Sequence, residues 1–221
     1  LDSFVILRIK PSCLRGYVTP LKSGNEKLDA FACALWLSFS LFCPEFVVSG
    51  ISASSPELKR FLKLIENSGV KVGVRMKGIA LEGEVNSISD DLSDCPELIP
   101  IAALLSTVSQ GICCLSVDEA DEETRNVFNY SAQMVEDLGA DSMVLYDRLM
   151  VKGNGKKLLG GIVNTRGDYR IAASAALAGL VSEGEISVSS AESINRVYPK
   201  FWQTYRVYGG NVYLKEHTGE V

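Results

Sequence analysis

The feature that most constrains the fold of this chain is a unit of about 70 residues that occurs three times. A glycine follows an amphipathic segment in each unit, and successive copies lie 70 positions apart: Gly69, Gly139 and Gly209. An acidic residue introduces an apolar segment in each unit, and successive copies lie 71 positions apart: Glu26, Glu97 and Asp168. A fixed period of this kind indicates one supersecondary unit packed against its own copies. We expect a single domain over residues 1–221, with units at about 13–86, 87–155 and 156–221.

Each unit has the same predicted order of elements. An almost uniformly apolar helix comes first, as expected of a helix buried on all sides: 28–42, 98–109 and 171–181. A short strand follows: 46–50, 112–117 and 186–189. A second, amphipathic helix comes next, and the glycine after it provides a left-handed C-cap: 56–67, 122–137 and 194–208. Strands then close the units: 71–74 with 79–85, 143–146 with 149–152, and 211–215.

This order predicts an α/β (α+β) fold of three βαβαββ-type units. One unit cannot bury both faces of its helices, whereas three units can place the apolar helices innermost and the sheets outside. The chain starts at Leu1 rather than Met and enters a strand-like run at residues 4–7. We therefore expect it to be a piece of a longer polypeptide.

Composition excludes several classes of function. The net charge is −5, with 47% apolar and 22% charged residues, and no stripe of Lys and Arg occurs, so we expect no nucleic-acid partner and no membrane partner. The apolar run at 30–43 is too short to span a bilayer. Six cysteines without a CxxC pair indicate buried, reduced thiols. A single histidine, His217, argues against a His-based triad or metal site.

Three central helices that start at one end of a domain would concentrate positive potential there. Each helix start has unpaired N–H groups and roughly half a positive charge. An acidic domain could thus bind a phosphorylated, carboxylated molecule on that face. The alternative is that Glu26, Glu97 and Asp168 only cap their own helices.

Four short segments carry a resemblance to a known family. The third unit contains Asp168-Tyr169-Arg170-Ile171-Ala172 and the run RVYPKFW at 196–202, and the second unit contains DLSDCPELIP at 91–100 and EETR at 122–125. In that order, they resemble the DHR-(I/M)-A-M, K-(T/S)-(F/Y)-P-x-(F/Y)-(F/W), D-x-x-x-x-P-D-x-x-P and K-E-(S/T)-D-R segments of the 5-enolpyruvylshikimate-3-phosphate synthase family. The resemblance is clearest over residues 87–206.

The resemblance implies a fold in which two threefold domains close on substrate, and this chain corresponds to the C-terminal domain. It implies transfer of an enolpyruvyl group from phosphoenolpyruvate to the 5-hydroxyl of shikimate 3-phosphate in the cytoplasm, with no metal and no cofactor. The family's N-terminal domain, with its Lys-Ser and S-S-Q motifs, is not in this sequence. We therefore expect the isolated chain to fold but to be inactive.

Site residues follow from the resemblance by position. Asp91 matches the carboxylate that contacts the target hydroxyl and acts as its base, and Glu122 matches the acid/base that protonates the enol carbon. The remaining matches bind substrate: Arg125, Asp168, Arg170 and Arg196. Each also has a purely structural interpretation, namely a cap before a helix for Asp91, a solvated first-turn carboxylate for Glu122, and surface charge for the arginines.

The sequence departs from the family at several positions. Asp121 stands where the family has a substrate-binding Lys, residues 119–123 are mostly acidic, and Tyr169 replaces a His. The family's G-D-x-S-S-A segment is not recognisable at residues 22–26. Two hypotheses therefore stay open, a working half-site and a homologue that has lost catalysis and serves as a binding, regulatory or assembly module. A relative of the UDP-N-acetylglucosamine enolpyruvyl transferase is a weaker third hypothesis.

Overall fold

The computed structural model describes residues 6–20, 29–155 and 157–214. The first unit runs through β2 (Gly16–Val18), α1 (Ala30–Phe42), β3 (Phe46–Val48), η1 (Pro56–Leu58), α2 (Lys59–Asn67), β4 (Lys71–Arg75) and β5 (Gly78–Glu82). The second runs through β6 (Ser89–Asp91), η2 (Pro96–Leu98), α3 (Ile99–Thr107), β7 (Gln110–Ser116), α4 (Glu122–Asp137), β8 (Asp141–Leu145) and β9 (Arg148–Asn154). The third runs through β10 (Gly161–Asn164), α5 (Tyr169–Val181), β11 (Ile186–Ser189), η3 (Ala191–Arg196), α6 (Phe201–Val207) and β12 (Asn211–Leu214).

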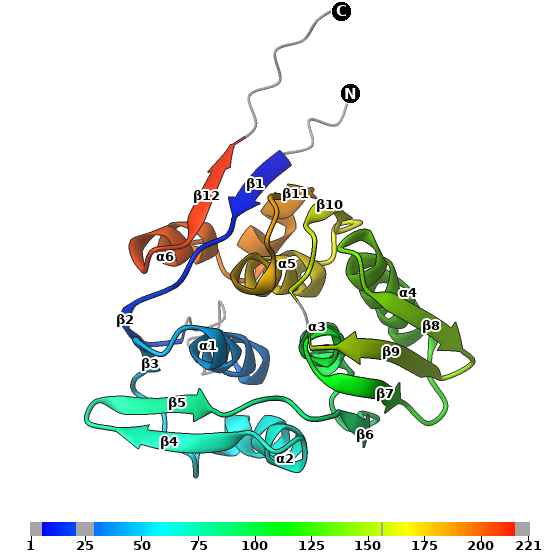
Figure 1. Ribbon diagram of the computed structural model, residues 1–221, viewed down its shortest axis with the longest axis horizontal. Coiled ribbons are helices and arrows are strands. Elements are labelled where there is room, and N and C mark those ends of the chain that lie inside the picture. Colours follow the sequence, from blue (N-terminus) through cyan, green and yellow to red (C-terminus); the bar gives the residue numbers. More distant parts are fainter. Residues whose placement is uncertain (1–5, 21–28, 156, 215–221) are drawn as a thin grey trace, which may run out of the picture.

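The three sheets share one topology. Their strand orders are β2-β3-β5-β4, β6-β7-β9-β8 and β10-β11-β1-β12. In each sheet the first two strands are parallel, and the others are antiparallel to their neighbours. The third sheet is completed by β1 (Ile6–Lys10), which pairs with both β11 and β12 in the place that β5 and β9 hold in the other sheets. A strand from the start of the chain thus closes the third unit (Figure 1).

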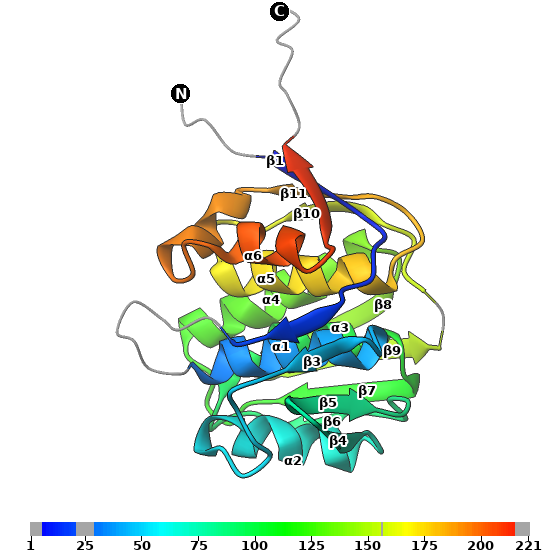
Figure 2. The same ribbon diagram turned by 90° about the vertical axis from the view of Figure 1, so that its left-hand side faces the viewer.

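The apolar helices α1, α3 and α5 contact one another at the centre, and the sheets surround them (Figure 1). Nearly every residue of these helices is buried. Seen from the side, the layers stack with α1 and α5 running in the same direction (Figure 2). The predicted α/β fold of three repeats with buried central helices and outer sheets is confirmed.

Small residues set how closely the layers approach. At Gly179 of α5, an added Cβ atom would lie 2.5 Å from Cγ2 of Ile9, so only glycine lets β1 lie directly on this helix.

The glycines predicted as C-caps adopt left-handed φ angles of +93°, +92° and +106°: Gly69, Gly139 and Gly209. The repeat period therefore reflects one helix-ending turn used three times.

One predicted element is wrong. Residues 194–208 do not form a continuous helix, because η3 ends at Arg196 and α6 begins at Phe201. Pro199 lies in the break; it has no N–H to donate, and it disfavours helical backbone at Tyr198 before it. Predictions for residues 4–5, 26, 28, 215 and His217 fall outside the described residues. Among the described helices, none is long and apolar enough to cross a membrane.

Candidate functional site

The starts of the three central helices meet around Tyr169. The Tyr169 ring makes edge contacts with Phe31 at 5.6 Å and with Tyr198 at 6.1 Å between ring centroids. Burial raises the pKa of Tyr169; Arg170 opposes this shift. Three carboxylates also raise the pKa of Tyr169, one from the start of each central helix: Asp29, Glu97 and Asp168. We call the surface formed by residues 29–31, 96–98 and 168–170 the helix-start face.

Two of these carboxylates cap their helices. The Ala32 N–H donates to Oδ1 of Asp29 at 2.9 Å, and the Arg170 N–H donates to Oδ1 of Asp168 at 2.8 Å. Capping is thus confirmed for Asp168. The capping alternative does not hold for Glu97, because Cys95 occupies the N-cap position of η2 and no side chain bonds there. Asp29 was not among the residues predicted from the sequence.

A tight loop sets the geometry of Asp168 and Arg170. The Arg166 N–H donates to Oδ1 of Asn164 at 2.9 Å, which forms a turn at the end of β10. Gly167 follows with a φ of +77°, in the left-handed region that glycine adopts without strain. The chain therefore leaves the strand, turns back and enters α5 with Asp168 as its cap.

Arg170 is the most strongly held of the predicted site residues. Its side chain is 14% exposed, and its Nη2 lies 2.8 Å from Oδ2 of Asp168 and 3.3 Å from Oε1 of Glu123. Burial works against the charge, but the bonds to Asp168 and the neighbouring charges of Asp168, Tyr169 and Glu123 together outweigh it and raise the pKa of the guanidinium. The guanidinium is therefore charged and already carries two carboxylates, of which Glu123 was missed from the sequence.

Asp91 ends β6 and is exposed. Its carboxylate accepts hydrogen bonds from the Ser93 N–H at 2.9 Å and from the Ser93 hydroxyl, and these bonds lower the pKa of Asp91. The Ser93 oxygen in turn accepts from the Asp118 N–H at 2.8 Å, which joins this turn to the segment before α4. Asp91 is therefore an ionised, accessible carboxylate in an ordered turn.

Arg60, which was not predicted from the sequence, holds the segment that carries Asp91. From the first turn of α2, its Nη1 lies 2.9 Å from Oδ2 of Asp90 and its Nε 2.8 Å from Oδ1 of Asp94. Its Nη2 also donates to the Asp91 carbonyl. One guanidinium thus fixes three successive parts of this turn, which makes Arg60 a positioning residue for Asp91.

The remaining predicted residues are exposed. Glu122 begins α4, and Arg196 ends η3; the side chain of neither makes a hydrogen bond or ion pair within the described residues. Nε of Arg125 lies 3.6 Å from Oδ1 of Asp147; the Arg125 side chain is exposed and that of Asp147 is half-buried. Asp121 caps α4 by accepting from the Thr124 N–H at 2.8 Å, which gives this acidic residue a structural role where the family has a Lys.

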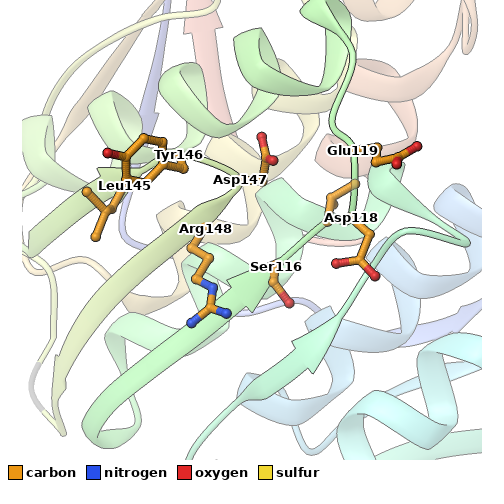
Figure 3. A pocket seen from close by; sticks show the side chains of 8 residues that line it. Ser116, Asp118, Glu119, Leu145, Tyr146, Asp147 and Arg148 are labelled. Carbon is orange, nitrogen blue, oxygen red and sulfur yellow. The ribbon is translucent and has the colours of Figure 1, made fainter.

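A separate pocket of about 440 Å³ lies where β7 leaves its sheet, beside the turn between β8 and β9. Its lining holds Ser116 and Arg148 on neighbouring strands and the carboxylates of Asp118, Glu119 and Asp147 (Figure 3). None of the predicted site residues lines this pocket, although Asp147 pairs with Arg125.

The structure joins only two of the predicted site residues directly, Asp168 and Arg170. Within the described residues, no hydrogen bond or ion pair links Asp91, Glu122 or Arg196 to this pair. Among the same residues, no group of three or more His, Cys, Asp or Glu side chains could hold a metal ion. The chemistry available at the helix-start face is anion binding by Arg170. The exposed carboxylates of Asp91 and Glu122, which do not belong to that face, are available for proton transfer.

Comparison with solved structures defines the class of protein. EPSP synthase from Acinetobacter baumannii superimposes with a TM-score of 0.67 at 19% identity, over 85% of this chain and 47% of that one. The enolpyruvyl transferase NikO from Streptomyces tendae gives a TM-score of 0.70 at 19% identity, over 85% and 44%. The chain therefore has the fold of an enolpyruvyl transferase domain.

Sequence comparison identifies the family. The sequence model of the EPSP synthase (3-phosphoshikimate 1-carboxyvinyltransferase) family matches residues 27–205. The chain therefore belongs to this family. The 3-phosphoshikimate 1-carboxyvinyltransferase of Clostridium novyi is 28% identical over 178 residues, which are 75% of this chain and 41% of the relative. That of Clostridium acetobutylicum is 26% identical over 219 residues, 90% and 49%. The chain thus spans somewhat under half the length of these relatives.

Proposed function

We propose that the chain supplies the C-terminal half of a site that transfers the enolpyruvyl group of phosphoenolpyruvate to the 5-hydroxyl of shikimate 3-phosphate. Family membership supports this reaction, and the share of each relative that the chain matches supports a half-site. In this proposal residues 1–221 form one C-terminal-type domain, and its partner is the family's N-terminal domain. The expected setting is the cytoplasm.

The observation that carries the proposal is the half-buried Arg170 at the start of α5. Its guanidinium is charged, oriented by Asp168 and placed where three central helices begin. A planar guanidinium suits the carboxylate and phosphate of phosphoenolpyruvate, and the helix starts favour the same charge. Arg125 and Arg196 are exposed and accessible as additional anion contacts.

Asp91 and Glu122 are the proposed proton-transfer residues. Asp91 takes the proton of the 5-hydroxyl as its oxygen bonds to C2 of phosphoenolpyruvate, and Glu122 gives a proton to C3. The resulting tetrahedral intermediate loses phosphate when the bond from C2 to the phosphate oxygen breaks. C3 returns its proton to Glu122, and the leaving phosphate takes the proton held by Asp91, so both carboxyl groups return to their starting states. The accessible, ionised Asp91 turn, which Arg60 and Ser93 fix, supports the first of these roles.

Phosphate release tests the proposal. The 221-residue chain is assayed with both substrates, alone and with the separately expressed N-terminal half of the Clostridium acetobutylicum relative. We expect no turnover by the chain alone and turnover in the mixture, which Arg170→Gln abolishes. Turnover by the chain alone, or turnover in the mixture that Arg170→Gln leaves unchanged, would contradict the half-site.

A second candidate is a binding module without catalysis. The pairing of the arginines favours this candidate, because Arg60, Arg125 and Arg170 each already contact carboxylates of the same chain. The acidic segment 118–123 adds negative charge next to the predicted substrate contacts. In the mixture, phosphoenolpyruvate binding without any phosphate release would favour this candidate.

A further inference from the structure

We infer that Glu123 competes with anionic ligands for Arg170 and thereby sets the anion affinity of the helix-start face. The inference deepens the proposed function, on which it rests, by naming a residue that controls access to the proposed substrate contact. Its starting point is the 3.3 Å distance between Oε1 of Glu123 and Nη2 of Arg170, two residues on different helices.

The two carboxylates on Arg170 are not equivalent. Asp168 is 10% exposed and contacts both Nε and Nη2 of the guanidinium, and it also caps α5. Glu123 is 75% exposed and contacts Nη2 alone. An incoming anion can therefore displace Glu123 without breaking the fold, whereas displacing Asp168 would also remove a helix cap.

The fold holds Glu123 within reach of Arg170. Asp121 fixes the first turn of α4 by capping the Thr124 N–H, and α4 packs against α5. The ring of Tyr130, further along α4, also lies 5.4 Å from the guanidinium carbon of Arg166 in the loop before α5. Glu122, the neighbour of Glu123, contacts no cation within the described residues, so only one of the two adjacent carboxylates is aimed at Arg170.

The consequence is a site that is occupied by its own side chain when no ligand is bound. A phosphate or carboxylate group must replace the Glu123 oxygen on Nη2 and must also approach its negative charge. Removing that charge while keeping the shape of the side chain should strengthen anion binding. An exposed ion pair of this kind corresponds to about a three- to tenfold change in Kd once the like-charge repulsion is included.

Calorimetric titration with inorganic phosphate, followed by phosphoenolpyruvate, tests this inference on the full 221-residue chain. The variants are Glu123→Gln, Glu119→Gln and the double variant Glu123→Gln/Arg170→Gln. Glu119 is exposed and precedes α4, so its substitution makes the same charge change without touching Arg170. Urea unfolding of each variant checks that the fold is retained; Gln at position 170 keeps a donor for Asp168.

Phosphate should bind Glu123→Gln about three- to tenfold more tightly than the unmodified chain. The control Glu119→Gln should change the Kd for phosphate by less than about twofold. In the double variant the gain in affinity should vanish. Equal effects of Glu123→Gln and Glu119→Gln, a gain that survives loss of Arg170, or no phosphate binding by any variant would overturn the inference.

The outcome is separable from the proposed function. A gain in phosphate affinity without enolpyruvyl transfer in the two-half mixture rejects only the function, and Arg170-dependent transfer without the gain rejects only the role of Glu123.

Discussion

The Tyr198 hydroxyl donates a hydrogen bond to Oδ1 of Asp29 at 2.6 Å, across 169 positions of sequence. The same Asp29 oxygen accepts from the Ala32 N–H at the start of α1. Tyr198 lies in the segment between η3 and α6, so the bond ties the first central helix to the third unit. One carboxylate therefore caps a helix and fixes the segment that follows Arg196.

Replacing Tyr198 with Phe should destabilise the protein by about 1–3 kcal/mol, because the ring stays buried while Asp29 loses its tertiary partner. Urea unfolding followed by circular dichroism measures the change. Tyr146→Phe is the matched control, since Tyr146 is 88% exposed and should change stability by less than about 0.5 kcal/mol. Equal effects of the two substitutions would show that the bond to Asp29 contributes nothing.

Arg60→Ala should also destabilise the chain, by about 1–3 kcal/mol, because Asp90 and Asp94 lose a shared, mostly buried cation. Arg75→Ala removes a more exposed pair with Glu82 and should cost less than about 1 kcal/mol. Comparison of urea midpoints separates the two. An Arg60→Ala variant as stable as Arg75→Ala would contradict the role given to Arg60.

Cysteine reactivity should follow burial. Cys13 is exposed and Cys114 is half-buried, whereas the other four thiols are buried: Cys33, Cys43, Cys95 and Cys113. A thiol-specific disulfide reagent at about pH 8 should modify Cys13 first, then Cys114, and the others only after denaturant is added. Mass spectrometry of the labelled peptides identifies the sites. Rapid labelling of any of the four buried thiols in the native chain would be inconsistent with this core.

Stability should fall at alkaline pH. Burial raises the pKa of the Cys33, Cys43 and Cys95 thiols to about 12. A thiol in an unfolded chain has a pKa of about 8.5. Above that pH the unfolded state binds fewer protons than the folded state, so the free energy of unfolding decreases as pH rises. Each thiol lowers the free energy of unfolding by about 1.4 kcal/mol per pH unit up to about pH 12. Below about pH 8 the thiols cause no such decrease. Urea unfolding at pH 7.5, 9 and 10 measures this slope, and a free energy that does not decrease above pH 9 would contradict it.

Local patterns predicted much of the fold. The bounds of α4 and β11 match the predicted 122–137 and 186–189, because each element carries its own apolar periodicity and α4 begins directly after its cap, Asp121. The place of β1 in the third sheet could not be predicted, since pairing with β11 and β12 depends on residues about 180 or more positions away. The polar β6 has no apolar alternation to reveal it.

The site was predicted less completely than the fold. Asp168 and Arg170 lie two positions apart at a helix start, so a short motif suffices to find them. Glu123 reaches Arg170 over 47 positions and Arg60 reaches Asp90 over 30, and both pairings exist only after the units assemble. Local pattern therefore identifies Asp168 and Arg170, whereas their partner Glu123 and the Arg60 cluster depend on tertiary contacts that no local pattern contains.

The most direct test of the account is a titration of phosphoenolpyruvate followed by backbone amide chemical shifts. We predict that the amides of Asp91, Arg170 and Arg196 shift together with one Kd, and that Arg170→Gln removes these shifts. Shifts confined to the separate pocket at Ser116 and Arg148, or no shifts near Arg170, would contradict a shared anion site at the helix-start face.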